Sequence, residues 1–171
     1  MKTSRKAFSL LLVLCLVIAG ALGSPSTSQA AASSSSVYNA VKDAYGSSYP
    51  LSDSNMIKTE RKDVFGNYSE VLGVSAKLFS EYTAAKKSSS EEEYMSFICK
   101  ATSNKNVKKI KKKLKLIVLN EYKSNINYHS DHCNTLLKNA KVGSKGSFVY
   151  LFVLDTEGNA KAINAFKESL S

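Results

Sequence analysis

The sequence predicts an α+β domain in which a small, mostly antiparallel sheet packs against a basic amphipathic helix. Residues Tyr94–Ala101 alternate like a half-buried strand, with Phe97 and Cys99 on one face. Residues 106–123 place apolar side chains every three or four positions, as a helix with one buried face does. The run Phe148–Leu154 is apolar on both faces, which is typical of a central strand. Together these segments favour a sheet with a helix across it.

Shorter elements complete the predicted domain. Apolar spacing predicts an N-terminal helix over Val37–Tyr45 and another helix over Ala76–Lys86. A short strand is expected at Ala140–Val142, joined to the central strand by a tight glycine-containing turn. Asp155–Asn159 is expected to form a turn, and apolar residues between Ala162 and Leu170 predict a final amphipathic helix.

The first 32 residues have the order of a secretory signal peptide. Three positive charges in the first six residues precede an apolar run from Ala7 to about Leu22, and Ala30–Ala32 supply small residues for cleavage. Residues 33–36, all serine, are predicted to be a linker, and residues 37–171 a single α+β domain. We therefore expect a secreted protein, or one associated with the outside of the cell envelope.

Two alternatives to cleavage remain at this stage. The first is a retained membrane anchor, although the apolar run is shorter than the roughly 20 residues of a spanning helix. The second is lipid modification of Cys15. Because Leu14 precedes Cys15 and apolar residues continue after it, we interpret this cysteine as an ordinary residue of the apolar run.

Positive charge is concentrated in one segment. The chain carries 24 Lys and Arg against 14 Asp and Glu. Removal of the signal would leave 21 basic residues and a net charge of +7, since the three basic residues of its start leave with it. That surplus equals one group of seven lysines within eleven residues that include no acid: Lys105, Lys108, Lys109, Lys111, Lys112, Lys113 and Lys115.

Several stretches resemble a family of uncharacterised exported or lipid-anchored proteins of Gram-positive, mainly clostridial, bacteria, defined as a domain of unknown function. The matching pieces are Val37–Gly46, the strand Phe97–Ala101, the lysine-bearing helix that follows it, and Val142–Tyr150. The resemblance covers residues 37–154, most of the chain after the signal. It implies export and the fold, but it implies no catalytic residue because the family has no established activity.

The lysine segment has two interpretations. It is either a solvated helix face whose aliphatic stems cover apolar surface, or a face that binds anions. Like charges three and four residues apart destabilise a helix by a few tenths of a kcal/mol per pair. A protein with no use for this charge could have included glutamates, and anion binding would explain why it does not. Outside a Gram-positive cell, the abundant anionic partners would be wall polymer and the membrane surface, with nucleic acid only incidental.

The segment around Cys133 contains weak candidates for metal binding. His129, Asp131, His132 and Cys133 bring three types of metal ligand into five residues. A stable site usually needs another ligand from elsewhere in the chain, and none is obvious. A polar loop with one structural cysteine is the alternative, and we predict no cofactor.

Two cysteines, Cys99 and Cys133, remain after removal of the signal. An oxidising extracellular space would permit one disulfide between them. The alternative is two packed thiols, since a buried cysteine behaves as a small apolar residue.

The sequence contains no recognisable catalytic constellation. Gly-x-Ser-x-Gly, His-Glu-x-x-His and Walker-type phosphate loops are absent, and no small-molecule ligand can be identified. We therefore expect a non-enzymatic envelope protein that binds anionic wall polymer or a membrane surface. The alternative is an extracellular enzyme that acts on wall material through an unrecognised active site.

Overall fold

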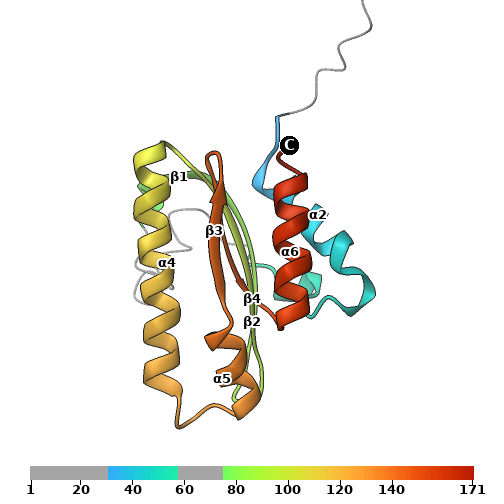
Figure 1. Cartoon of the computed structure of the whole chain (residues 1–171), viewed down its shortest axis with the longest axis vertical. Helices are drawn as coiled ribbons and strands as arrows, with labels where there is room; N and C mark the ends of the chain where they lie inside the picture. Colours follow the sequence, from blue (N-terminus) through green and yellow to red (C-terminus); the bar gives the residue numbers. More distant parts are fainter. Residues whose placement is uncertain (1–30, 58–74) are drawn as a thin grey trace, which may run out of the picture. The chain divides into compact units, whose positions relative to one another are not determined.

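A computed structural model of the chain describes residues 31–57 and 75–171. The predicted signal peptide, apart from its last two residues, lies outside these ranges. The α+β class is confirmed, because the described residues form one four-stranded antiparallel sheet with helices on both faces (Figure 1). None of the described helices is long and apolar enough to cross a membrane.

The sheet contains β1 (Phe79–Ser88), β2 (Glu93–Ala101), β3 (Lys141–Lys145) and β4 (Phe148–Val153), in the order β1-β2-β4-β3. The predicted strand at 94–101 and the central position of the run at 148–154 are both confirmed. Residues of β4 alternate between two apolar layers, which explains why this run is apolar throughout. The predicted strand at 140–142 corresponds to β3, an edge strand.

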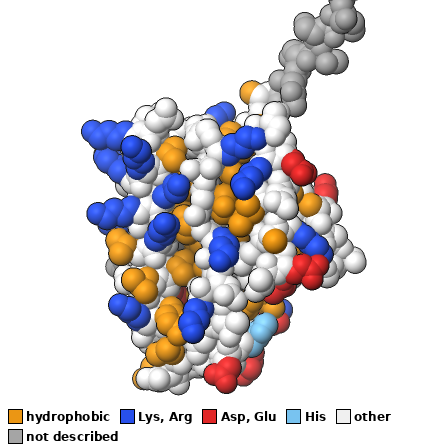
Figure 2. Space-filling view, in the orientation of Figure 1, with side chains coloured by type: hydrophobic (Ala, Val, Ile, Leu, Met, Phe, Trp, Pro, Cys, Tyr) orange, Lys and Arg blue, Asp and Glu red, His pale blue; other side chains and the backbone are white. Residues whose placement is uncertain are grey.

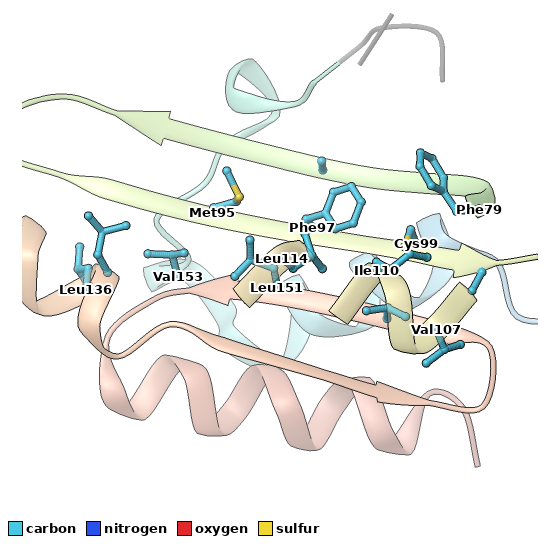
Figure 3. Packing of buried hydrophobic residues seen from close by; sticks show 14 of the residues in the cluster. Phe79, Met95, Phe97, Cys99, Val107, Ile110, Leu114, Leu136, Leu151 and Val153 are labelled. Atoms are coloured by element: carbon cyan, nitrogen blue, oxygen red, sulfur yellow. The ribbon is translucent and has the colours of Figure 1, made fainter. Parts of the chain in front are cut away.

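One face of the sheet is covered by α4 (Asn104–Asn125) and by the short α5 (Asp131–Lys138). Figure 3 shows Val107, Ile110 and Leu114 of α4 pointing at Phe97 and Cys99 of β2. The predicted long helix and its buried stripe are therefore confirmed. The predicted polar loop at 129–133 is wrong from residue 131 onward, because Ser130 caps a helix there.

The other face is covered by α2 (Ser34–Tyr45) and α6 (Thr156–Glu168), which also pack against each other (Figure 1). Tyr150 and Phe152 of β4 stack there, with ring centroids 4.7 Å apart, and Phe166 of α6 packs edge-on against both. Short 3₁₀ turns complete the described chain at Gly46–Ser48, Asp53–Asn55 and Ala76–Leu78.

The all-serine segment 33–36 is not a linker. Ser33 caps α2 by accepting a hydrogen bond from the backbone N–H of Ser36, and Ser36 accepts one from the N–H of Ser33 in return. Ser34 is buried, and its backbone N–H donates to Glu81 of β1. These serines therefore form the cap and the first turn of α2, and the prediction of a flexible linker is wrong.

The helix expected at residues 76–86 is wrong: the segment forms a 3₁₀ turn at Ala76–Leu78 followed by β1. The pairing of β1 with β2 shifts between Phe79 and Glu81, which breaks the alternation of buried and exposed residues. The turn expected at 155–159 is also wrong beyond its first residue, because Asp155 caps α6.

Candidate functional site

The seven lysines of the predicted cluster all lie in the first twelve residues of α4. Ser103 caps this helix by accepting a hydrogen bond from Asn106, and the apolar stripe of the helix faces the sheet. The lysines are therefore turned outward: Lys111 is half-buried and the other six are exposed. Figure 2 shows basic side chains along this flank, with apolar side chains between them.

The structure divides these lysines into two sets. Lys108, Lys111, Lys112 and Lys115 line an open groove of about 580 Å³ between α4 and the β3–β4 hairpin. The groove is closed on the other side by Ser144 and Gly146 of the hairpin, and it is lined further by Asn104 and Val107 of α4. The remaining three lysines do not line it and form a separate stripe with a spacing of four residues: Lys105, Lys109 and Lys113.

One lysine connects the two walls of this groove, which we call the lysine groove. The Nζ atom of Lys111 donates a hydrogen bond of 3.3 Å to the Oγ atom of Ser144 on β3. An ammonium group and a hydroxyl group from different elements therefore face the same space. Among the residues that the structure describes, no acidic side chain lines the lysine groove, and its charged lining residues are all lysines.

Some lysines elsewhere in the described chain do pair with acids. Lys42, Lys86 and Lys161 pair with carboxylates at 2.9, 2.8 and 2.7 Å respectively. Within the described residues, none of the seven α4 lysines makes an ion pair with an acid. Lys105 also lies in the first turn of α4, where the helix dipole adds further positive potential. The first three turns of α4 therefore carry concentrated positive charge.

A second groove continues from the first. Its volume is about 330 Å³, and it lies between the second half of α4, α5 and β3. Lys115 and Lys138 line this groove. Its other six lining residues have largely apolar side chains: Val118, Leu119, Tyr122, Leu137, Ala140 and Val142. We call it the apolar groove. Because Lys115 lines both grooves, the two are adjacent.

The second half of α4 also exposes apolar residues. Leu116 and Leu119 are 43% and 44% exposed, and Ile126 and Tyr128 are exposed after the helix. The exposed face of α4 is thus basic near the N-terminus of the helix and more apolar near its C-terminus.

The metal-ligand candidates do not assemble into a site in the structure. Asp131 and His132 are exposed in the first turn of α5, whereas Cys133 is buried beneath that turn. The Nε2 atom of His132 is 3.2 Å from the hydroxyl of Tyr94, and His129 precedes the helix. Across residues 31–57 and 75–171, no three His, Cys, Asp or Glu side chains come together as metal ligands.

Of the two alternatives for Cys99 and Cys133, the structure has the packed thiols, because both cysteines are buried and free. Burial raises the pKa of each thiol, which keeps it protonated and unreactive. Ser130, the cap of α5, donates its backbone N–H to Ser90 and its hydroxyl to Glu91, just before β2 begins. Cys133 therefore lies near the start of β2.

Cys99 lies six residues beyond Glu93, the first residue of that strand. At about 3.3 Å per residue this is roughly 20 Å. A disulfide requires Cα atoms closer than about 7 Å, so the separation excludes the bridge without large backbone movement.

Comparisons with known proteins add no functional assignment. The chain matches no known protein family, and searches of characterised proteins and of solved structures also find no match. The resemblance to the exported Gram-positive family stays a prediction, and the functional argument depends on the geometry of α4 and β3.

Proposed function

We propose that this chain is an exported, non-enzymatic protein of the cell envelope that binds anionic polymer or a membrane surface through the lysines of α4. The observation that carries this proposal is a group of seven outward-facing lysines on about three turns of one helix. None of them has an acidic partner in the described chain. The signal-like N-terminus supports export, and the concentrated charge supports an anionic partner.

The cost of this arrangement supports a functional interpretation. Lys105, Lys108, Lys109 and Lys112 repel one another at three- and four-residue spacing, and the positive end of the helix dipole also opposes Lys105. A surface that served solubility alone would lower this cost with interspersed acids, as the paired lysines elsewhere in the chain do.

Binding to a defined polyanion tests the proposal. The processed protein should bind immobilised poly(glycerol phosphate) and should not bind neutral dextran. Binding should weaken steeply between about 20 mM and 500 mM salt, because exposed charges are screened within about 10 Å at 0.1 M. Substitution of four exposed α4 lysines by Gln should remove most of the binding: Lys108, Lys109, Lys112 and Lys113.

A matched control separates the α4 face from net charge. The control replaces four exposed lysines outside the cluster by Gln: Lys77, Lys123, Lys141 and Lys167. It removes the same charge and should retain most of the binding. Equal losses in both variants would make the effect one of net charge alone, and binding that survives salt and the α4 variant would refute the proposal. Turnover of wall material by the wild-type protein would instead favour an enzyme.

The location is tested on the native protein. Intact mass should show an N-terminus between Ser24 and Ser33, and fractionation should find the protein in the salt-extractable wall or the medium. Retention of Met1, or a lipid on Cys15, would contradict the proposed processing.

A further inference from the structure

The lysine groove and the apolar groove lie next to each other along α4, and we call the pair the channel. Both are lined by α4 on one side and by β3 or the β3–β4 hairpin on the other, and Lys115 lines both. The lining side chains differ between its two parts. Four lysines and the hydroxyl of Ser144 line one part, and six apolar or aromatic side chains line most of the other.

A lysine-lined groove beside an apolar groove is complementary to an amphiphile, which has an anionic head group and an apolar chain. We propose that the channel binds a single-chain lipid with an anionic phosphate head group. The head group lies among Lys108, Lys111 and Lys112, where the Ser144 hydroxyl can donate to a phosphate oxygen. The acyl chain runs over Leu119 and Tyr122 in the apolar groove. The inference rests on the proposed function in one respect, since both use the lysines of α4.

The length of the channel fits an acyl chain with a head group. The distance along α4 from Lys108 to Tyr122 is roughly 21 Å at 1.5 Å per residue. The apolar part, from Lys115 to Tyr122, accounts for roughly 10 Å of it. The hydrocarbon of one bilayer leaflet is about 15 Å deep, so this part covers about two thirds of an extended chain. The volumes of both grooves, about 580 and 330 Å³, also lie within the usual range for small-molecule sites.

An anionic polymer explains only half of the channel. A repeating polyanion would be held by the lysines but would gain nothing from the apolar groove next to them. Leu119 is 44% exposed in that groove, and its contact with water is removed only by an occupant with apolar surface. An amphiphile satisfies both parts at once.

Three probes separate the contributions of head group and chain. Myristoyl lysophosphatidylglycerol, kept below its critical micelle concentration, is titrated into the processed protein and followed by calorimetry. Glycerol 3-phosphate supplies the head group without the chain, and myristoyl lysophosphatidylcholine supplies the same chain with a zwitterionic head group. We expect saturable binding of the first probe, at least about tenfold tighter than either of the others. Equal affinity for lysophosphatidylglycerol and glycerol 3-phosphate would overturn the proposal.

Two leucines of nearly identical exposure provide a matched pair. Leu119 lines the apolar groove, whereas Leu116, one turn earlier, lines neither groove. Leu119→Gln should weaken binding of the anionic lysolipid about tenfold or more, and Leu116→Gln should leave it unchanged. Equal losses would indicate that the outer face of the helix inserts into lipid, and would refute the groove. Both sites are exposed, so both variants should fold, which their urea midpoints would verify.

The lysines offer a second matched pair with the same change in charge. Lys108→Gln with Lys112→Gln removes two charges from the lysine groove, and Lys109→Gln with Lys113→Gln removes two from the stripe outside it. Only the first pair should weaken lysolipid binding strongly, whereas equal losses would refute a defined head-group site.

The proposed polyanion binding is tested separately, because Leu119→Gln should leave binding of poly(glycerol phosphate) unchanged. Lysolipid binding without polymer binding would refute the polymer binding of the proposed function and retain the channel, and the reverse result would refute the channel alone.

Discussion

The charge on α4 should cost the protein stability, and replacing Lys105 by Glu tests this directly. Lys105 is the second residue of the helix after the Ser103 cap, and the first turn contains no acid. Lys108 and Lys109 follow at three- and four-residue spacing, so Lys105 repels both. Lys105→Glu converts both repulsions into attractions and places a negative charge at the positive end of the helix dipole.

The expected gain follows from these terms. Two like-charge pairs of about 0.2–0.5 kcal/mol are removed and two attractive pairs of similar size are formed. An acid in the first turn adds about 0.3–1 kcal/mol. Lys105→Glu should therefore raise the free energy of unfolding by about 1.5 kcal/mol at low ionic strength. Lys105→Gln removes the repulsion without adding an acid and should provide less than about half of this gain.

Urea denaturation at about 20 mM and 1 M salt measures the effect, since the Debye length falls to about 3 Å at 1 M. The gain should shrink at high salt. Lys123→Glu is the matched control, because Lys123 lies in the last turn of the same helix, where the dipole favours a positive charge. That substitution should destabilise the protein. A gain that persists at 1 M salt, or the same sign at both ends of α4, would refute this reasoning.

Three further predictions concern the core and its polar contacts. Leu114→Ala, at a fully buried position of α4, should lower the free energy of unfolding by about 2–5 kcal/mol in urea denaturation, and a loss below about 1 kcal/mol would contradict its placement. Asp155 accepts a 2.6 Å hydrogen bond from Tyr45, which lowers the pKa of the Asp155 carboxyl group. The charge of Asp155 therefore stabilises the fold above the unfolded pKa of about 4. This stabilisation is lost as the pH falls through the lower pKa of the folded state. Asp155→Asn should therefore cost about 1 kcal/mol at pH 7 and progressively less below about pH 4, and a cost independent of pH would show that the charge is unimportant. Cys99 and Cys133 should resist thiol reagents in the native protein and react after unfolding without reductant, whereas absence of reaction in urea would indicate a disulfide.

The elements that the sequence predicted correctly are those with an uninterrupted pattern. The buried stripe of α4 and the alternation along β2 are regular, and their periods distinguish helix from strand. β1 was predicted as a helix because Leu78, Tyr82 and Ala85 fall at helical spacing. The register shift after Phe79 removes the alternation that would have identified the strand. A bulge of this kind is decided by pairing with β2, which single-sequence spacing does not contain.

Two helices were missed or shortened because their capping residues were interpreted as loop residues. Ser130 and Asp155 are good turn formers, but each accepts a hydrogen bond from a backbone N–H three residues later and begins a helix. In α5 the buried residues Cys133, Leu136 and Leu137 are spaced by three and four, a signal that was present in the sequence. Its eight residues were too few for that spacing to stand out.

The candidate site was only half visible in the sequence. The lysines were identified from their spacing alone, because they lie on one continuous helix. The grooves could not be predicted, because their other wall includes Ser144 and Val142 of β3, a strand that begins 16 residues after α4 ends. Pairing of β3 in the sheet is what places it beside α4. Which lysines face a groove and which face solvent is a property of this tertiary contact.

The pairing of α2 with α6 has a consequence for the order in which the chain can fold. α2 is the first helix of the described chain and α6 is the last, and together they cover one face of the sheet. During synthesis, α2 emerges long before Tyr150 and Phe152, and the contact of these two rings with Phe166 forms only after α6 has been made. This face of the sheet is therefore completed last, and until then α2 lacks its α6 partner.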